Sequence, residues 1–453
     1  MRLKSIDPST GQELATYKEF STSQINQVLE NSLLAQLHWK ETSLEFRLDH
    51  LNEMIGVLSD GRREFSILMA HEMGKPLSQA EGEIEKCIWL CEYYRDNSLH
   101  FLKDEIIEHD THKCFVTIQP LGLILGIMPW NFPVWQLIRF MIPSLMVGNT
   151  CLIKPADNTY RIADYMASFF KKNPIVRICP VHNTTTTQLI QHPDIAGISF
   201  TGSVSVGRHI GTLAMAEFKP CVLELGGSDP YIITEDADID AATTAAVTAR
   251  FTNAGQTCIS AKRFYFQDNI FEYAKSLLIK KTAEYIRYGN PLEPTTTIGP
   301  IARYDLKKGL CNILRQVPND WIDYQDHAPS AQGLYIPATI LNGQCMPTDH
   351  ALLKQEVFGP IAICQSFHTI QQVIEYANNS PYGLGASIWT QNPATQQQCI
   401  QQIQAGTIAI NTPVQSQCDR PFGGHKQSGM GVELGIEGAL SFTNIKSIIN
   451  PNQ

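Results

Sequence analysis

The feature that most constrains the fold is a repeated alternation of short extended runs with helical runs in the central part of the chain. The extended runs are rich in apolar and β-branched residues, and they read TCLIKP, PIVRIC, GISF and CVLEL between residues 150 and 225. Segments with helical spacing separate them. Neighbouring parallel strands need a long crossover connection, which a helix usually supplies. The alternation therefore predicts an α/β fold with a doubly wound parallel sheet.

Helical patterning dominates the region before this alternation, over residues 22–97. Apolar side chains recur there at spacings of three and four, and glycines and a proline divide the run. Further helices are expected over residues 134–146, 163–170 and 241–251. The tail, residues 441–449, has the apolar and β-branched composition of one more strand.

The size and charge of the chain limit the class of protein. With 453 residues it exceeds one ordinary hydrophobic core, so two or three packed units are expected. It is 43% hydrophobic and 17% charged, its formal net charge is -9, and its Lys and Arg residues form no runs. These values predict a globular protein with no surface for nucleic acid and no basic membrane anchor.

The twelve cysteines occur singly and form no CxxC pairs. In a chain of this size that pattern predicts reduced thiols in a cytoplasmic protein, with neither a disulfide framework nor a metal site. The opening residues are polar and lack the apolar core of an export signal. The most apolar stretch, residues 121–146, is interrupted by prolines and by Arg139, which argues against a membrane span.

A glycine-containing turn follows the GISF run and precedes a helical run. It includes Gly202, Ser203 and Gly207. Glycines in a strand-to-helix turn let the backbone approach a phosphate, and the helix N-terminus offers free N–H groups. The spacing matches neither GxGxxG nor a P-loop, which disfavours a kinase or an ATPase. The turn predicts a nucleotide site, with an ordinary structural turn as the alternative.

Three further residues are candidates for chemistry. Cys258 follows a glycine-containing turn, FTNAGQTC, which suits a reactive thiolate, although an inert buried cysteine is the alternative. Glu224 ends the apolar VLEL run, where a carboxylate needs a role or an ion-pair partner. Asn131 lies between prolines and aromatic residues in PWNFP. A rigidly held side-chain amide suits an oxyanion hole, with a simple aromatic turn as the alternative.

Together these motifs resemble the aldehyde dehydrogenase superfamily over nearly the whole chain. Further motifs that carry the resemblance are DPSTG, EMGKP, Lys154-Pro155, FTGS, LELGG, EVFGP and PFGG, in that order along the sequence. Glu224 precedes Cys258 by 34 positions, a separation that is typical of the family. Within the family, the chain looks most like bacterial succinate-semialdehyde dehydrogenases.

The resemblance implies a covalent mechanism. The cysteine that matches Cys258 attacks the aldehyde carbon, and its own N–H together with the amide that matches Asn131 stabilises the oxyanion. Loss of hydride from the thiohemiacetal leaves a thioester. The glutamate that matches Glu224 then activates the water that hydrolyses it. The presence of Glu224 argues against transfer of the acyl group to coenzyme A.

The resemblance also implies NAD or NADP as the cofactor. The positions that match cofactor-binding residues are Trp130, Lys154, Asp157, Gly202, Ser203, Gly207, Leu225, Glu356 and Phe358. Lys154 would contact the adenosine ribose, and Glu356 the nicotinamide ribose. Asp157 stands where many NAD-preferring relatives carry Glu. Its shorter side chain leaves room for a 2′-phosphate, but its charge repels one, so the choice between NAD and NADP stays open.

Arg139 carries the prediction about the substrate. It lies alone in an apolar run, and a buried arginine needs either a protein acid or a substrate anion. In succinate-semialdehyde dehydrogenases the matching arginine binds the substrate carboxylate, so succinic semialdehyde is the expected substrate. A structural salt bridge is the alternative for Arg139. Thr252 replaces a second arginine of many such enzymes, and Arg420 could compensate. The aromatic residues expected to line the aldehyde tunnel are Trp130, Trp135 and Phe422.

The family fold has a Rossmann-type cofactor domain, an α/β catalytic domain and a small β oligomerisation element. By analogy, residues 1–100 and 121–223 form the dinucleotide-binding domain, and residues 224–426 the catalytic domain. Residues 101–120 and 427–453 form the oligomerisation element, which predicts a homodimer or homotetramer.

Three other functions remain as alternatives. An uncharged aldehyde could be oxidised by the same mechanism. A thiol esterase could use Cys258, Asn131 and Glu224 without any cofactor. A binding or structural protein could retain an inactive enzyme scaffold, but every expected catalytic position is occupied, which argues against it.

Overall fold

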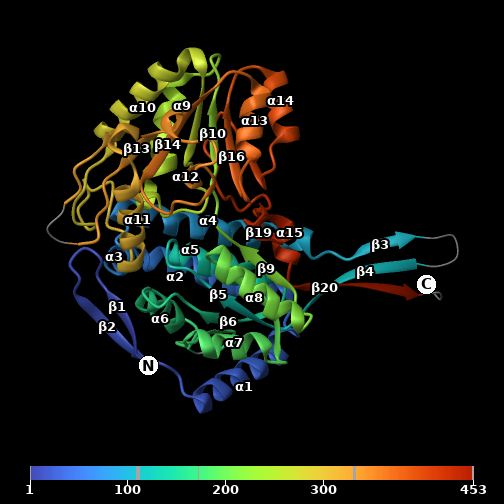
Figure 1. The fold of residues 1–453 in the computed structure, drawn as a ribbon. Coiled ribbons are helices and arrows are strands. Elements are labelled where there is room, and N and C mark those ends of the chain that lie inside the picture. Colours follow the sequence, from blue (N-terminus) through green and yellow to red (C-terminus); the bar gives the residue numbers. More distant parts are fainter. Residues whose placement is uncertain (1, 109–112, 172, 330–332, 451–453) are drawn as a thin grey trace.

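The structure is a computed structural model that describes residues 2–108, 113–171, 173–329 and 333–450. Two sheets of mainly parallel strands form its centre, and helices cover both faces of each sheet (Figure 1). A separate three-stranded sheet extends away from them. The predicted α/β fold, with a Rossmann-type part, a second α/β part and a small β element, is confirmed.

The first sheet has six strands in the order β19-β9-β8-β5-β6-β7. All neighbours in it are parallel except β19, which runs antiparallel to β9. The strands are β5 (Leu123–Ile127), β6 (Thr150–Lys154), β7 (Val176–Ile178), β8 (Ile195–Thr201), β9 (Cys221–Glu224) and β19 (Gly429–Met430). The helices between and beside them are α1 (Thr22–Trp39), α5 (Pro133–Met146), α6 (Tyr160–Ser168), α7 (Asn183–Gln191) and α8 (Val204–Ala216).

Successive residues of β5 face opposite sides of this sheet, as the pleat of a strand requires. Leu123 and Leu125 belong to the core under α1, α7 and α8, whereas Ile124 belongs to the core under α5. Gly126 leaves space for the ring of Phe140 on α5, because a Cβ at this glycine would lie 2.5 Å from that ring. Both faces of the strand are therefore buried, which explains its uninterrupted apolar sequence.

The second sheet has seven strands in the order β12-β13-β14-β11-β10-β16-β17, and only the pair β12-β13 is antiparallel. Its strands are β10 (Pro230–Ile233), β11 (Arg263–Gln267), β12 (Ile322–Gln325), β13 (Thr339–Asn342), β14 (Ile361–Phe367), β16 (Gly385–Trp389) and β17 (Thr407–Ile410). The accompanying helices are α9 (Ile239–Phe251), α10 (Phe271–Tyr285), α11 (Tyr304–Gln316), α12 (Ala351–Lys354), α13 (Ile370–Asn378) and α14 (Pro393–Gln402).

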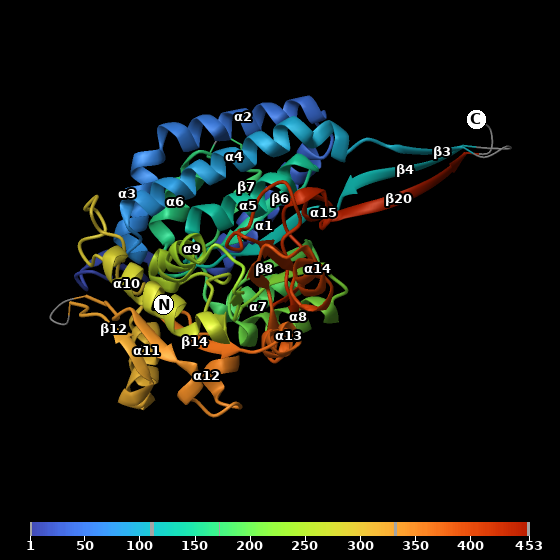
Figure 2. The same cartoon turned by 90° about the horizontal axis from the view of Figure 1, so that it is seen from above.

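Three long helices fill the predicted helical region beyond α1. They are α2 (Leu44–Asp60), α3 (Arg62–Met73) and α4 (Leu77–Phe101), and α2 and α4 lie along one side of the molecule (Figure 2). Helix α3 ends at Gly74, whose left-handed φ of 75° stops the helix. The predicted helices at 134–146, 163–170 and 241–251 are confirmed to within a few residues as α5, α6 and α9.

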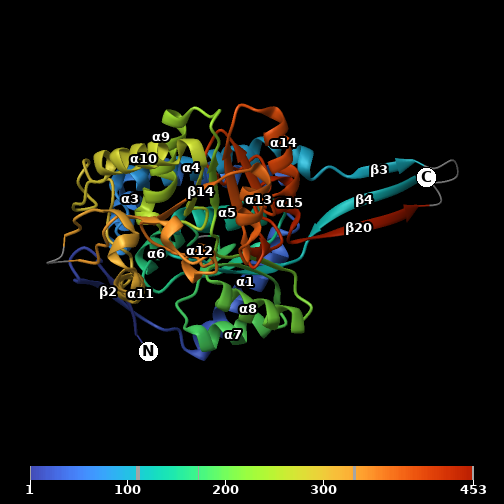
Figure 3. The ribbon, with the colours of Figure 1, turned by 45° about the horizontal axis from the view of Figure 1, so that its top comes forward.

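The third sheet consists of β3 (Glu105–Glu108), β4 (Lys113–Pro120) and β20 (Thr443–Asn450), in the order β20-β4-β3. It projects from the body of the molecule as an antiparallel ribbon (Figure 3). Its strands carry exposed isoleucines, including Ile445 at 62% and Ile449 at 70% exposure. The predicted C-terminal strand is therefore present.

The remaining elements complete the chain. They are the hairpin β1 (Arg2–Ile6) and β2 (Glu13–Lys18), the pair β15 (Tyr382–Gly383) and β18 (His425–Lys426), and helix α15 (Gly435–Leu440).

The chain passes from the first sheet to the second between β9 and β10, close to the predicted domain boundary at residue 224. Toward the C-terminus, β19 joins the first sheet and β20 joins the ribbon. The described part of the predicted segment 427–453 thus contributes strands to two sheets, and the domain division remains a prediction. Among the described residues, no helix has the length and apolar character needed to cross a membrane.

Candidate active site

Cys258 follows an unusually tight turn at the end of α9. Asn253, Ala254 and Gly255 have consecutive positive φ values of 54°, 54° and 72°. Left-handed backbone at residues other than glycine costs energy, and surrounding contacts must hold it in place. At Gly255, a Cβ would lie 2.5 Å from the carbonyl oxygen of Gly359. The turn thus brings Cys258 close to the segment that carries Glu356.

Side-chain amides fix the same turn. The Nδ2 of Asn253 donates to the carbonyl of Asn131 at 2.9 Å, and the Nε2 of Gln256 donates to the carbonyl of Asn253 at 3.0 Å. The Oε1 of Gln256 accepts from the backbone N–H of Ala302 at 2.9 Å. These bonds join the cysteine turn to the PWNFP segment and to Ala302. The amide side chains of Asn253 and Gln256 thus hold the turn in its conformation.

Asn131 lies at the other side of this contact. Its Nδ2 donates to the carbonyl of Gln256 at 3.1 Å, and its side chain is 5% exposed. A primary amide has two N–H donors, so one remains for a reacting oxygen beside the turn. Helix α5 begins two residues later with Pro133, which sets the backbone direction after Asn131.

Glu224 is the last residue of β9 and pairs in register with Thr201 of β8. Its side chain is buried, and neither of its carboxylate oxygens has a hydrogen-bond partner among the described residues. Burial raises the pKa of Glu224 well above its usual value, which the cation of Arg139 partly offsets and the neighbouring Glu433 reinforces. A buried, unpaired carboxyl with a raised pKa suits a general base in a catalytic site.

The two glycines after Leu225 connect the base to the rest of the site. A Cβ at Gly226 would overlap the carboxylate of Glu356, and a Cβ at Gly227 would overlap the backbone carbonyl of Cys258. The N–H of Gly227 donates to Glu356 Oε1 at 3.2 Å. The LELGG segment is therefore the place where the base, the cysteine and Glu356 come together.

Buried cations hold the segment that carries Glu356. Arg250 donates to the carbonyls of Val357 and Gly359, and Lys262 donates to the carbonyls of Leu352 and Gln355. Burial raises the pKa of Glu356 to about 7, although the N–H of Gly227 and the two cations oppose the shift. Glu356 is thus fixed in position and partly exposed beside the cysteine turn.

Several of the expected cofactor residues lie at the carboxyl ends of strands in the first sheet, whereas Glu356 and Phe358 precede β14 of the second sheet. The chain runs outward from β5 through β6 to β7 and then returns to place β8 on the other side of β5. Ligands of doubly wound sheets bind where the strand order reverses in this way. Trp130 follows β5, Gly202 follows β8, and Lys154 ends β6. This edge of the sheet is therefore the position at which a dinucleotide would be expected.

The start of α8 adds a phosphate position to this edge. Ser203 is the N-cap residue, is exposed, and makes no side-chain bond to the helix N-terminus, so the first N–H groups of α8 are free for an anion. Gly207 lies against Leu225, since a Cβ there would overlap the leucine side chain. Lys154 and Asp157 form an ion pair of 2.7 Å, and Trp130 packs edge-on against Phe358 at 5.7 Å between ring centroids.

The charge of Arg139 is balanced by an acidic side chain of the protein itself. The guanidinium forms an ion pair with Glu433, whose Oε1 accepts from Ser199 at 3.2 Å. Arg139 also contacts Thr201 at 3.4 Å and lies over the ring of Phe422 at 5.4 Å. The arginine is 2% exposed. The structural salt bridge expected as the alternative for Arg139 is therefore present, and Glu433 was missed because nothing in its sequence context marks it.

This ion pair leads to a prediction about stability. Arg139→Met should lower the free energy of unfolding by about 3–5 kcal/mol, because Glu433 then remains buried without its cation. The double variant Arg139→Met/Glu433→Gln should recover part of that loss. Denaturant unfolding of each variant checks this. Arg420→Met is the matched control and should leave the unfolding midpoint unchanged. An unchanged midpoint in Arg139→Met would show that the pair contributes nothing.

The remaining expected substrate residues divide into two groups. Trp135 and Phe422 are buried in the same core cluster against which Cys258 packs. Arg420 instead lies at the surface and pairs with its neighbour Asp419 at 2.8 Å. Lys86 of α4, which sequence reasoning did not select, has its Nζ 4.1 Å from the centroid of the Trp135 ring. The structure thus brings a second cation to this part of the core.

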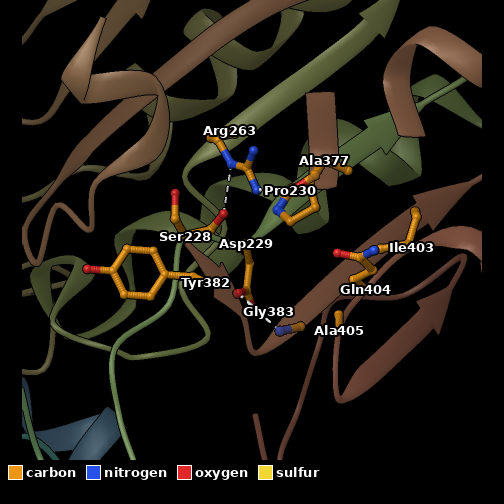
Figure 4. A pocket seen from close by; sticks show the side chains of 11 residues that line it. Ser228, Asp229, Pro230, Arg263, Ala377, Tyr382, Gly383, Ile403, Gln404 and Ala405 are labelled. Carbon is orange, nitrogen blue, oxygen red and sulfur yellow. Dashed lines mark hydrogen bonds between the residues drawn. The ribbon is translucent and has the colours of Figure 1, made fainter. Parts of the chain in front are cut away.

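A small pocket lies behind the LELGG segment, in the second sheet (Figure 4). Ser228, Asp229 and Arg263 line it, with the Nε of Arg263 donating to the carbonyl of Ser228 at 2.8 Å. Asp229 accepts from the N–H of Gly385 at 3.1 Å. Cys258, Glu224 and Asn131 are not among the lining residues. These contacts anchor the strand that follows Gly227. Elsewhere in the described ranges, no cluster of three or more His, Cys, Asp or Glu side chains could hold a metal ion.

Known proteins agree with this geometry. The structure superposes on succinic semialdehyde dehydrogenase from Streptococcus pyogenes, solved with NADP+ as the cofactor, with a TM-score of 0.95 and 30% identity over 99% of this chain and 100% of that one. The chain is 37% identical to the probable NADP(+) succinate-semialdehyde dehydrogenase of Synechocystis, over 99% of both chains. It is 33% identical to the NAD(P)+ succinate semialdehyde dehydrogenase of Escherichia coli, over 98% of this chain and 97% of the relative.

Fold and site therefore define an NAD(P)-dependent oxidoreductase of mixed α/β architecture. The sequence profile of the aldehyde dehydrogenase family matches residues 1–448, and the chain belongs to that family. The resemblance inferred from the sequence motifs is thus confirmed.

Proposed function

We propose that this protein oxidises succinic semialdehyde to succinate with NADP or NAD. The observation that carries the substrate is a partly buried cation, Lys86, which has no carboxylate ion-pair partner among the described residues and whose charge interacts with that of Cys258. Arg139 and Lys86 are cations that act on each other and on the cysteine. Glu433 balances Arg139, whereas Lys86 has only a hydroxyl and an aromatic ring as its described partners. An aldehyde with a carboxylate at its far end would balance the other. The relatives from Synechocystis and Escherichia coli described above are both named for oxidation of succinate semialdehyde.

In this proposal Cys258 is the nucleophile. Burial raises the pKa of its thiol to about 12, and Arg139 opposes that shift. The thiol must therefore pass its proton to a base before Sγ can attack the aldehyde carbon. The second Nδ2 proton of Asn131 and the N–H of Cys258 would stabilise the oxygen of the resulting thiohemiacetal.

The remaining steps belong to Glu224 and to the cofactor residues. When bound, NADP or NAD supplies the hydride acceptor. Gly202, Ser203 and the start of α8 would hold the phosphates, while Glu356 would hold a ribose. After hydride has left, a thioester remains on Cys258. Glu224 would accept a proton from a water molecule while the oxygen of that water attacks the thioester carbon. The bond to Cys258 then breaks, which releases succinate.

The experiment compares kcat/KM for succinic semialdehyde with that for butanal, using NAD and NADP in turn. A carboxylate that meets a desolvated cation should favour the semialdehyde by at least about 30-fold. Equal kcat/KM values for the two aldehydes would contradict succinic semialdehyde as the substrate. They would indicate an aldehyde dehydrogenase that acts on uncharged substrates. Hydrolysis of an activated ester at full rate without NAD or NADP, combined with no aldehyde oxidation, would point to the thiol esterase instead.

The ribbon is proposed to pair with a second copy of the chain. Its exposed isoleucines are unusual for a strand in contact with water, and the strands of a ribbon offer unpaired edges. Ile445 and Ile449 lie on one face of β20. A homodimer, or a homotetramer of paired dimers, would cover them. In this proposal the protein works in the cytoplasm, where its twelve free cysteines stay reduced.

Ile445→Asp/Ile449→Asp is expected to shift the protein toward the monomer, because two charges would be buried in the interface. Light scattering coupled to size-exclusion chromatography measures the mass, and circular dichroism checks the fold. Ile400→Asp, which changes an exposed isoleucine of α14, is the control and should keep the mass of the wild type. An unchanged mass in the double variant would show that this face of the ribbon is not the interface.

A further inference from the structure

We infer that Lys86, and not Arg139, is the cation that receives the carboxylate of the substrate. This inference rests on the proposed function and deepens it. It assigns the recognition of an acidic aldehyde to a lysine on α4, at the contact of that helix with the start of α5.

Arg139 is poorly suited to this role because its charge is already balanced. Its guanidinium forms the buried ion pair with Glu433 and lies over the ring of Phe422. A substrate carboxylate would have to approach a cation that already has an anion beside it. Separating that pair would leave Glu433 buried and unpaired, which is strongly unfavourable.

Lys86 has the opposite environment. Its Nζ donates to the hydroxyl of Ser416 at 2.7 Å and lies over the Trp135 ring, and no described carboxylate forms an ion pair with it. Two acids of the same helix are already paired: Glu85 with Arg62, and Glu83 with Lys75. Glu83 also accepts the N–H groups of residues 134 and 135 at 2.9 and 2.8 Å. A partly buried ammonium with only a hydroxyl and a ring for partners retains its affinity for an anion.

The position of Lys86 also fits the far end of a short substrate. Trp135 stands four residues after Asn131, in the first turn of α5, and it belongs to the core cluster against which Cys258 packs. A negative charge on Cys258 would raise the pKa of Lys86, so the two groups lie close enough to interact electrostatically.

The protonation of Lys86 predicts how recognition depends on pH. Burial and the charge of Arg139 lower the pKa of Lys86 to about 8, against the opposing effects of Cys87, Glu83 and Cys258. The ammonium is therefore present below about pH 8 and is lost above it. Cys418, from the segment that carries Ser416, also faces this lysine, and burial keeps its thiol protonated in this range.

The test compares Lys86→Met with Lys86→Arg. The ratio of kcat/KM for succinic semialdehyde to that for butanal should fall at least about 30-fold in Lys86→Met, chiefly through a higher KM for the semialdehyde. Lys86→Arg keeps the charge and should retain most of the ratio. The control Lys280→Met removes an exposed lysine of α10 and should retain all of it. A ratio that persists in Lys86→Met but is lost in Arg139→Met would overturn the inference.

A second measurement uses the wild-type protein and does not depend on the folding of any variant. The KM for succinic semialdehyde should rise from pH 7 to pH 9.5, while the KM for butanal changes much less. Taking the ratio of the two substrates cancels the titration of Glu224. A ratio that is constant over this range would overturn the role of Lys86 but leave the proposed substrate in place. A wild-type enzyme with no preference for the semialdehyde would overturn both.

Discussion

Cys258→Ala is expected to reduce kcat for aldehyde oxidation by at least about 10⁴-fold, because the proposed covalent intermediate forms on the sulfur that this substitution removes. The substitution removes one sulfur atom from a partly exposed position, so the turn formed by Asn253, Ala254 and Gly255 should persist. Steady-state formation of NADPH or NADH measures the effect. Binding of the oxidised cofactor, followed by tryptophan fluorescence, should be close to that of the wild type.

The matched control for this variant is Cys311→Ala, which changes a partly exposed cysteine on α11. It should keep the wild-type rate. If Cys258→Ala kept more than about one hundredth of the wild-type kcat with an intact fold, covalent catalysis by Cys258 would be excluded, since that loss is far smaller than removal of a nucleophile causes.

Glu224→Gln is expected to separate the two halves of the reaction. The amide has the shape of the carboxyl but cannot accept a proton, so hydrolysis of the thioester should slow by about 10²–10⁴-fold. Hydride transfer comes first and should still occur. Rapid mixing should therefore show a burst of one NADPH or NADH per active site, followed by very slow turnover.

Rescue distinguishes this loss from general damage to the site. Hydroxylamine attacks thioesters without help from a base, so adding it should restore turnover in Glu224→Gln. A variant with neither burst nor rescue would show that Glu224 is needed before acyl transfer, and the assignment of the water-activating base would fail.

The pH dependence of the wild type follows from the raised pKa of Glu224. Burial favours the protonated carboxyl, which cannot act as a base, so the fraction of active carboxylate grows as the pH rises. The rate of thioester hydrolysis should therefore increase with pH over a range that lies above the titration range of an ordinary glutamate. A hydrolysis step already at its maximum near pH 5 would mean that Glu224 ionises with an ordinary pKa.

The overall fold could be predicted from the sequence because its strands and helices have distinct spacings. The buried strands β5 and β6 have uninterrupted apolar sequences, and the helices between them have three-and-four spacing. The hairpin of β1 and β2 was not predicted, since its short strands mix polar with apolar residues and their pairing depends on a turn. The order of strands in each sheet also comes only from the structure.

The site was predictable where a residue lies within a recognisable motif. Cys258, Glu224 and Asn131 were selected in this way, and the structure brings all three to one region between the two sheets. Gln256 and Asn253 lie beside Cys258, but their role appears only when their amide groups are seen to hold the turn.

The partners of Arg139 show the limit of such reasoning. Its sequence context indicated that a buried arginine needs an anion, which is correct. The anion is Glu433, nearly three hundred residues away, and no local pattern links the two positions. Lys86 was overlooked for a different reason. A lysine on a helix of mixed polar and apolar residues, such as α4, usually faces water.

The most direct test of the account is to trap the acyl group. Glu224→Gln is mixed with succinic semialdehyde and NADP or NAD, quenched in acid, digested and analysed by mass spectrometry. One succinyl group per chain is expected, on the peptide that contains Cys258, and only when the cofactor is present. An acyl group on another of the twelve cysteines, or formation of reduced cofactor with none on Cys258, would contradict it.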